Sequence, residues 1–194
     1  RKILLMEAVG MLKDPDQKFV ILKRLQGYNS KEIAELMKKS WAKHGIKKYD
    51  NKGNLQEYVI KPDINGNGIP VTIIWGYNQT QPIAKIEGAT LSQVMTALNI
   101  SDIALADIVV KSNADIDQAS EDLLITSLDA FRNNTNLKNF QITTYTYDLL
   151  IGVTSITPTN GVREIYKYDT ANRLEKVVDI NGNILKEYKY HFKQ

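Results

Sequence analysis

From Tyr166 to Tyr190 the sequence reads Y-K-Y-D-T-A-N-R-L-E-K-V-V-D-I-N-G-N-I-L-K-E-Y-K-Y. Parts of this stretch occur elsewhere in the chain. Tyr-Asp pairs begin at Tyr49, Tyr147 and Tyr168, and the pentapeptide D-I-N-G-N begins at Asp63 and again at Asp179. Recurrence of this kind predicts an internal repeat in which each unit is a strand, a turn and a strand.

Tyrosines stand at alternate positions on both sides of the last turn. Tyr166 and Tyr168 precede it, and Tyr188 and Tyr190 follow it. Alternation puts such residues on one face of a strand, where aromatic side chains pack across a half-buried sheet. The Asn181-Gly182 dipeptide favours a tight hairpin turn in which both central residues have positive φ. These patterns predict antiparallel β-hairpins.

A helical segment is expected to interrupt this β-rich region. Residues 71–75 and 82–87 predict two paired strands, and 89–99 predicts a helix. A longer helix is predicted over 117–133, with Leu124, Leu128 and Phe131 on one face. Residues 101–111 fit a helix or a strand, and strands resume from Phe140. The expected fold class is α+β: a helical head over 1–48, then antiparallel hairpins over 49–194 with a helical insertion at about 89–133.

Composition and charge narrow the class of protein. The chain has 194 residues, of which 43% are hydrophobic and 24% charged, as in a globular protein. No apolar run reaches the length that a membrane-spanning helix needs, so no membrane span is expected. The absence of cysteine excludes disulfides and thiolate metal sites. Residues 1–49 hold twelve basic and five acidic residues, so the head is basic and the remainder acidic.

The basic head is typical of two different surfaces. It is either a solvated lysine-rich helix face or a surface for nucleic acid or a protein partner. Asp14-Pro15 predicts a helix start, Gly27 a helix end, and Asn29 the start of a second helix whose inner side carries Ile33 and Leu36. Helix, glycine turn and helix form the outline of a helix-turn-helix.

The head also carries a resemblance to a family. The segment D-P-D-Q-K-F-V-I-L-K-R-L-Q-G-Y-N-S-K-E-I-A-E-L-M, residues 14–37, is similar to the promoter-reading helix-turn-helix of bacterial RNA polymerase sigma factors, and the likeness covers about 3–40. A further basic helix should then enter the major groove, but Gly45 and turn residues interrupt the segment that follows. This alternative implies a cytoplasmic DNA-binding transcription protein. Its phosphate contacts would come from Lys31, Lys38, Lys39, Lys43, Lys47 and Lys48.

A second resemblance covers roughly residues 47–194. The run Y-K-Y-D-T-A-N-R-L-E-K-V-V-D-I-N-G-N resembles the Tyr-Asp repeats of RHS proteins. W-G-Y-N-Q-T-Q-P-I-A-K-I-E-G, residues 75–88, and T-Y-T-Y-D-L-L-I-G-V-T-S-I-T-P, residues 144–158, resemble segments of RHS-repeat proteins of the Bacteroidetes type. Asn172 stands where a glycine is usual, and His191 where the next aspartate would fall. The resemblance implies stacked β-hairpins that are secreted or displayed at the cell surface, with other RHS repeats or a surface or secretion partner.

Candidate sites for chemistry are few. Residues 63–68 begin like a calcium loop, but Ile74 stands where such a loop needs a glutamate, so turn chemistry accounts better for them. His44 and His191 lack zinc-site spacing, and the acid pair Asp115/Asp117 suits a helix start. We therefore predict no catalytic, cofactor-binding or metal-binding residue. The expected function is a non-catalytic segment of an exported RHS-repeat cell-surface protein, a structural or interaction module. The alternative is the sigma-factor-like DNA-binding protein.

Overall fold

The structure is a computed structural model that describes residues 47–60 and 67–190. Two compact units are distinguished, Arg1–Ile46 with Val59–Gly68, and Lys47–Tyr58 with Ile69–Gln194. The second is called the sheet unit below. The predicted helical head, residues 63–66 of the first D-I-N-G-N copy and His191 lie outside the described residues.

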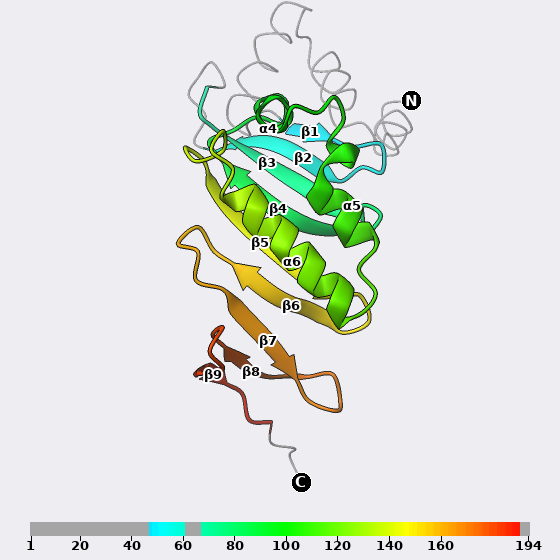
Figure 1. The fold of residues 1–194 in the computed structure, drawn as a ribbon, viewed down its shortest axis with the longest axis vertical. Coiled ribbons are helices and arrows are strands. Elements are labelled where there is room, and N and C mark those ends of the chain that lie inside the picture. The colour runs from blue at the N-terminus through cyan, green and yellow to red at the C-terminus, as the bar shows by residue number, and fades with distance from the viewer. Residues whose placement is uncertain (1–46, 61–66, 191–194) are drawn as a thin grey trace, which may run out of the picture. The chain divides into compact units, whose positions relative to one another are not determined.

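The described strands form one nine-stranded antiparallel sheet whose strand order follows the sequence (Figure 1). The prediction of an α+β fold with antiparallel hairpins is confirmed at this level. The pairing of β3 with β4, predicted from 71–75 and 82–87, is also confirmed. The strands are β1 (Lys47–Tyr49), β2 (Leu55–Ile60), β3 (Ile69–Gly76), β4 (Gln81–Glu87), β5 (Gln141–Asp148), β6 (Gly152–Thr157), β7 (Glu164–Tyr168), β8 (Leu174–Val178) and β9 (Ile184–Glu187).

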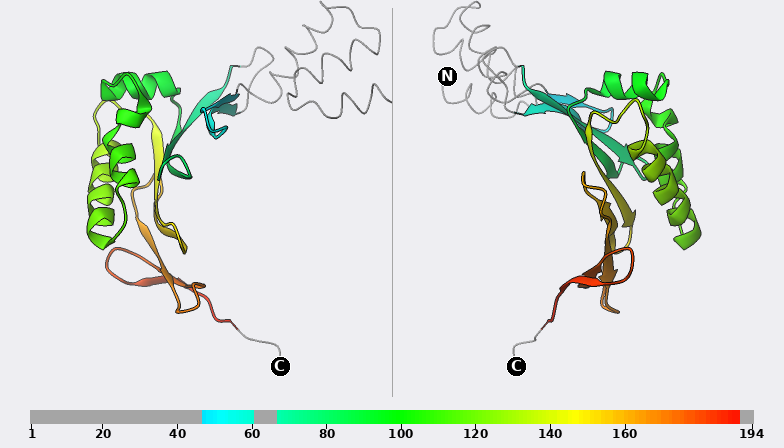
Figure 2. Two further views of the ribbon diagram at one scale, coloured as in Figure 1. Left: turned by 90° about the vertical axis from the view of Figure 1, so that its right-hand side faces the viewer. Right: turned by 60° about the vertical axis from the view of Figure 1, so that its left-hand side comes forward.

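The helices of the described residues stand between β4 and β5, as the predicted insertion requires. They are α4 (Leu91–Leu98), the 3-10 turn η1 (Ile103–Leu105), α5 (Asp107–Asn113) and α6 (Gln118–Arg132). Residues 101–111, which fitted a helix or a strand, therefore adopt η1 and the first part of α5. All three α-helices lie on one face of the sheet (Figure 2), where α5 contacts β3 and β4 and α6 contacts β5.

Side-chain caps fix the starts of two helices. The Thr90 hydroxyl accepts from the Gln93 N–H, and the Gln93 side chain accepts from the Thr90 N–H, which is a capping box. Asp117 and Ser120 form the same reciprocal pair at the start of α6. The expectation that the carboxylate of Asp117 stands at a helix start is confirmed, because it satisfies one of the free N–H groups there.

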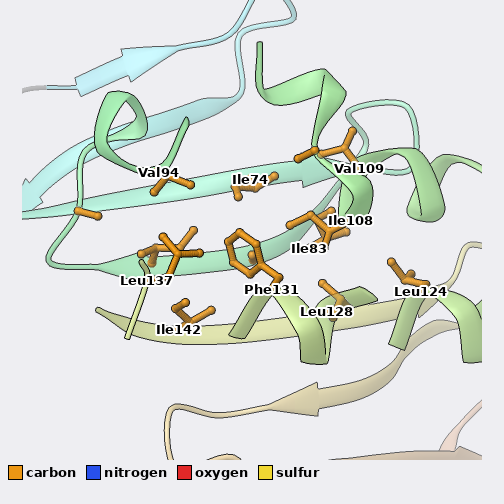
Figure 3. Close-up of a cluster of buried hydrophobic side chains, with 14 of the residues drawn as sticks. Ile74, Ile83, Val94, Ile108, Val109, Leu124, Leu128, Phe131, Leu137 and Ile142 are labelled. Atoms are coloured by element: carbon orange, nitrogen blue, oxygen red, sulfur yellow. The ribbon is translucent and has the colours of Figure 1, made fainter. Parts of the chain in front are cut away.

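The hydrophobic core lies between the helices and β3, β4 and β5 (Figure 3). The predicted inner face of α6 is confirmed, since Leu124, Leu128 and Phe131 are all buried. They meet Ile83 of β4 and Ile142 of β5 in one cluster. Burial of apolar area at about 25 cal/mol per Å² makes this cluster the main source of stability in the sheet unit.

Three hairpin turns share one backbone pattern. In Asp50–Asn54, Asp169–Arg173 and Asp179–Asn183, the N–H of the fourth residue donates to the carbonyl oxygen of the aspartate, and the aspartate N–H donates to the carbonyl oxygen of the fifth residue. The fourth residue has a positive φ: 86° at Gly53, 58° at Asn172 and 83° at Gly182. This is a β-turn closed by a left-handed residue with a bulge.

The aspartate carboxylate holds each of these turns. Oδ1 of Asp169 accepts from the N–H groups of Ala171 and Arg173, at 2.8 and 3.0 Å. Oδ1 of Asp179 accepts from Asn181 and Asn183 in the same way. The strand register shifts just before the aspartate in all three hairpins. The Tyr-Asp pairs that begin at Tyr49 and Tyr168 and the D-I-N-G-N copy that begins at Asp179 therefore mark strand–turn–strand units, as predicted.

The predicted geometry of the Asn181-Gly182 turn is wrong. Only Gly182 has a positive φ, whereas the two-residue hairpin requires it at both residues. The reason is Asp179, whose carboxylate binds two N–H groups of the loop and so favours a longer turn with a single left-handed position. The same geometry explains Asn172, because asparagine tolerates the left-handed region better than other residues that have a Cβ.

Candidate functional site

Among the described residues, a run of non-glycine residues with positive φ lies in the loop between β3 and β4. Tyr77, Asn78 and Gln79 are three consecutive residues with positive φ, at 50°, 57° and 61°. The N–H of Thr80 donates to the Gly76 carbonyl oxygen at 3.1 Å and closes a left-handed turn. Each such residue costs on the order of 1–3 kcal/mol, and residues of this kind gather at functional sites. This left-handed turn, residues 77–79, is the starting point for a candidate site.

Helix α5 supports the left-handed turn on one side. A Cβ on Gly76 would stand 2.2 Å from Oγ of Ser112, so only glycine lets the strand approach the helix this closely. The Tyr77 N–H donates to Oγ of Ser112 at 3.3 Å. The Asn78 N–H donates to Oδ1 of Asn113 at 2.6 Å. Two side chains at the end of α5 therefore bind backbone groups of the turn.

The Asp50 hairpin turn holds the left-handed turn on another side. Lys52 Nζ donates to the Asn78 carbonyl oxygen at 2.6 Å, and Nδ2 of Asn54 donates to the Gln79 carbonyl oxygen at 2.9 Å. Nε2 of Gln79 in turn donates to Oδ2 of Asp50 at 3.2 Å. A repeat-type turn and the strained turn are thus joined by side chains more than twenty residues apart.

The Tyr77 side chain fixes the turn from inside the core. It is 2% exposed, and its hydroxyl donates to Oδ2 of Asp115 at 2.7 Å. The same hydroxyl accepts from the Tyr147 N–H at 3.0 Å, and the two tyrosine rings meet edge to face with centroids 5.7 Å apart. Burial, followed by the hydrogen bond to Asp115, raises the pKa of Tyr77 above its ordinary value. Burial also raises the pKa of Asp115.

A cleft of about 620 Å³ opens beside the left-handed turn. We call it the Trp75 cleft. Its size falls in the range of sites for small ligands and short chain segments. Its lining residues come from the end of β1, the Asp50 turn, β2, the end of β3, the left-handed turn, η1 with its cap, and α5: Tyr49, Asp50, Asn51, Lys52, Gln56, Ile74, Trp75, Asn78, Gln79, Asp102, Ile103, Ala104, Val109 and Asn113.

Trp75 is held in a fixed position in this cleft. Its indole Nε1 donates to the carbonyl oxygen of Leu55 at 2.9 Å. The donor of the ring is therefore used within the fold, and what the indole offers a ligand is apolar surface. Tyr49 adds a second aromatic ring that is 56% exposed.

A second cleft, of about 780 Å³, lies at the end of α6. Its arginines already have partners. The Arg132 guanidinium donates to the carbonyl oxygens of Ile142, Thr157 and Pro158. Arg163 pairs with Asp129. These cations hold the loops around the cleft together, so it is the weaker candidate for a ligand site.

The lysines predicted to contact phosphates are only partly within the structure. Lys31, Lys38, Lys39 and Lys43 lie outside the described residues. Lys47 is the first residue of β1. Lys48 pairs with the buried carboxylate of Glu57 at 2.7 Å, and that carboxylate also accepts from the Leu91 N–H. The ammonium group of Lys48 thus has a partner within the sheet unit.

Two tyrosines of the last hairpins donate hydrogen bonds from their hydroxyl groups to backbone carbonyl oxygens. Tyr168 donates to the Val153 carbonyl oxygen at 2.8 Å, and Tyr190 donates to that of Leu174 at 2.8 Å. The Arg173 guanidinium lies 4.7 Å from the centre of the Tyr190 ring. Among the described residues, the ring contact between two tyrosines is that of Tyr77 with Tyr147, which lies outside these hairpins.

Several aspartates serve the backbone. Hydrogen bonds from Arg173 hold the pKa of Asp169 below its ordinary value, and hydrogen bonds from Asn183 do the same for Asp179. Ser120 lowers the pKa of Asp117. Within residues 47–60 and 67–190, no group of three His, Asp or Glu side chains is close enough to bind a metal ion. None of the helices described there is long and apolar enough to cross a bilayer.

Sequence reasoning missed the left-handed turn and the Trp75 cleft. In the sequence, the W-G-Y-N-Q segment indicates only a resemblance to RHS proteins. The local signals for the turn are Gly76, which stands just before it, and Asn78 within it, because asparagine tolerates positive φ better than glutamine does. Nothing in the spacing of the sequence indicated that the Asp50 turn and α5 meet there.

Comparison with known proteins adds no assignment. Neither the protein-family models nor the curated proteins with which the sequence was compared give a match.

Proposed function

We propose that the sheet unit is a run of hairpins of the RHS, or Tyr-Asp repeat, type and serves as a non-catalytic structural and interaction segment of an exported cell-surface protein. The observation that carries the proposal is the common turn at Asp50, Asp169 and Asp179. Two of these turns begin at the aspartate of a Tyr-Asp pair, and all three keep the same hydrogen bonds, left-handed position and register shift.

The order of the strands supports a repeat that can be extended. β7, β8 and β9 pair one after another, and β9 is one of the two edge strands of the sheet that the described residues form. All four of its residues are exposed. An edge strand has unpaired N–H and C=O groups that can bind another strand. A further hairpin of the same type would continue the sheet at this edge.

The roles of the turn aspartates Asp169 and Asp179 support a non-catalytic segment. Catalytic carboxylates commonly have raised pKa values in a cleft. The carboxylates of Asp169 and Asp179 instead accept backbone N–H groups of their own turns, and their pKa values are lowered. Their chemistry is that of turn formation.

Surface-protease treatment of intact source cells tests the location. Peptides from β5 to β8 should appear in the released fraction, identified by mass spectrometry. A cytoplasmic marker protein that stays with the cells is the control. Recovery of these peptides only after lysis would contradict the proposal. Turnover of a glycan or a nucleic acid by the purified chain would contradict its non-catalytic part.

A turn exchange tests the repeat itself. The triple variant T170N/A171K/N172G gives the Asp169 turn the central residues of the Asp50 turn and keeps Arg173. Because the two turns have the same geometry, we expect the free energy of unfolding to change by less than about 0.5 kcal/mol. A loss comparable to that of a core substitution would show that the turns are not equivalent.

A further inference from the structure

We propose that the Trp75 cleft binds an extended, cationic peptide segment of a partner protein. The peptide would place an apolar side chain against the rings of Trp75 and Tyr49 and a lysine or arginine beside Asp102. This proposal deepens the interaction role proposed above. It rests on that role in one respect only, namely the cell surface as the place where the chain meets its partner. Binding itself is a property of the purified chain.

The base of the cleft is aliphatic but almost closed to solvent, so the apolar surface open to a ligand comes from Ile103 and from the aromatic rings above it. Ile74 and Val109 are 1% and 6% exposed, and Ile103 is half-buried next to them in the lining. Trp75 and Tyr49 supply the rings. Grooves of this kind accept apolar side chains of an extended chain, which supply most of the binding energy.

Amide side chains stand among these apolar groups. The amide of Gln56 has no hydrogen-bond partner among the described residues. Asn113 uses Oδ1 for the Asn78 N–H, which leaves its NH₂ group for a ligand. A side-chain amide offers one carbonyl and two N–H bonds, and so matches the N–H and C=O groups of a peptide backbone.

The charge of the cleft selects a cation. Its lining has two carboxylates, Asp50 and Asp102, and one ammonium, Lys52, which already donates to the Asn78 carbonyl oxygen. Oδ1 of Asp102 accepts from the Ala104 N–H at 2.9 Å, and the other oxygen is left for a partner. A lysine or arginine is attracted to such a site, whereas the phosphates of a nucleic acid are repelled.

The strained turn makes the wall of the cleft rigid. Asn78 and Gln79 line the cleft, and their backbone is held by Asn113, Lys52 and Asn54. A wall that is ordered before binding loses little conformational entropy when the ligand arrives. This gives the left-handed conformation a role that core packing alone does not require.

A neutral glycan fits the cleft less well. Sugars stack on aromatic rings and bond to amides, so Trp75, Tyr49 and Gln56 would serve them too. A neutral glycan gains nothing from the charge of Asp102. The dependence of binding on Asp102 therefore separates the two ligand classes.

The test uses the full chain on arrays of immobilised peptides of about eight residues that carry leucine and, a few positions away, lysine or arginine. Matched arrays carry glutamate in place of the basic residue, and a third array carries neutral glycans. We expect capture on the cationic peptides. The Y49A and D102N variants should each weaken the affinity for these peptides about tenfold, because Y49A removes an apolar contact and D102N removes an ionic contact. The amide oxygen in D102N can still cap η1.

Two further variants make the result specific. Asp122, on the exposed side of α6, lies outside the cleft, so D122N should bind as the parent does. D102K should shift the preference toward the glutamate peptides. Far-UV circular dichroism checks that each variant is folded. The proposal is overturned by no capture on any peptide, by capture that neither Y49A nor D102N changes, or by capture of neutral glycans that depends on Tyr49 alone. The protease experiment above is independent of all three results.

Discussion

Two parts of the sheet unit are stabilised in different ways. The covered part, β3 to β6 with the three helices, has a buried core in which Ile83, Ile86, Val94 and Leu124 are fully enclosed. The hairpin tail, residues 164–190, buries Val177 and Val178 and leaves β9 exposed. Its order comes from the aspartate turns and from tyrosine hydroxyl groups. The repeated sequence thus encodes turns, and the core is encoded elsewhere.

The junction of these parts is short. β6 and β7 pair only through Ser155 with Ile165 and Ile156 with Glu164. The side chain of Arg163 adds an ion pair with Asp129 of α6. If the two parts rely on different interactions, substitutions in them should differ in size and in kind. Four sets of variants, given in order of decreasing expected loss of stability, test this difference.

Truncation of the core should have the largest effect. Leu124 is fully buried, so L124A should lower the free energy of unfolding by about 2–5 kcal/mol, through lost burial and the cavity that remains. The matched tail variant is I184A, at a residue 58% exposed, where less than about 0.5 kcal/mol is expected. Urea unfolding followed by circular dichroism measures both. Equal losses would show that the tail has a core of its own.

Glycine substitutions should separate crowding from backbone conformation. In G76A the new Cβ would stand 2.2 Å from Oγ of Ser112 and 2.7 Å from Cγ2 of Ile83. This overpacking of the covered part should lower the free energy of unfolding by about 1–3 kcal/mol. Gly182 has open space but φ 83°, so G182A should cost about 1 kcal/mol through its conformation alone.

Asparagine distinguishes the two causes in the same unfolding measurement. G182N should recover much of the loss of G182A, because asparagine tolerates positive φ. G76N should be worse than G76A, because a larger side chain has even less room. If asparagine were equally harmful at both positions, crowding would explain both.

The left-handed position of the Asp169 turn should reject β-branched residues. Asn172 has φ 58°, so N172V should cost about 1–2 kcal/mol in the free energy of unfolding. N172G should stay within about 0.5 kcal/mol of the parent, because glycine adopts this conformation freely but loses more entropy on folding. Thermal unfolding of the purified variants checks both. A harmless valine would mean that the tail adjusts its turn at no cost.

Acid should weaken the tail through its turn aspartates, and this effect is expected to be the smallest. Hydrogen bonds to their carboxylates lower the pKa values of Asp169 and Asp179 in the folded chain. The folded chain therefore holds fewer protons than the unfolded one near pH 4. The stabilisation is complete above the unfolded pKa of about 3.9 and is lost as the pH falls through the lower folded value.

The double variant D169N/D179N should lose this part of the pH dependence. Melting temperatures between pH 6 and pH 2 measure it, and D122N on α6 should keep the dependence of the parent. Asp115 should oppose this trend, because burial raises its pKa and acid then stabilises the folded chain at that group. The contribution of the turns is therefore taken from the difference between the curves of the parent and the double variant. A parent-like curve for the double variant would show that the turns do not depend on these charges.

The sequence determined the elements whose signals are local. The caps and apolar spacing of 117–133 predicted α6, and the Tyr-Asp and D-I-N-G-N pieces predicted hairpin turns, because capping, periodicity and turn chemistry act within a few residues. The class of fold followed from the same signals. The geometry of the Asn181-Gly182 turn was missed because a carboxylate two residues earlier decided it.

The tertiary structure alone decided the candidate site. The Trp75 cleft forms where the Asp50 turn, the left-handed turn and α5 meet, and the residues concerned are 25 to 38 positions apart in the chain. No periodicity or motif relates positions at such separations. Apart from the tolerance of Asn78 for positive φ, the sequence does not indicate the strain at residues 77–79 either, because Tyr77 and Gln79 enter the left-handed region only when their surroundings hold them there.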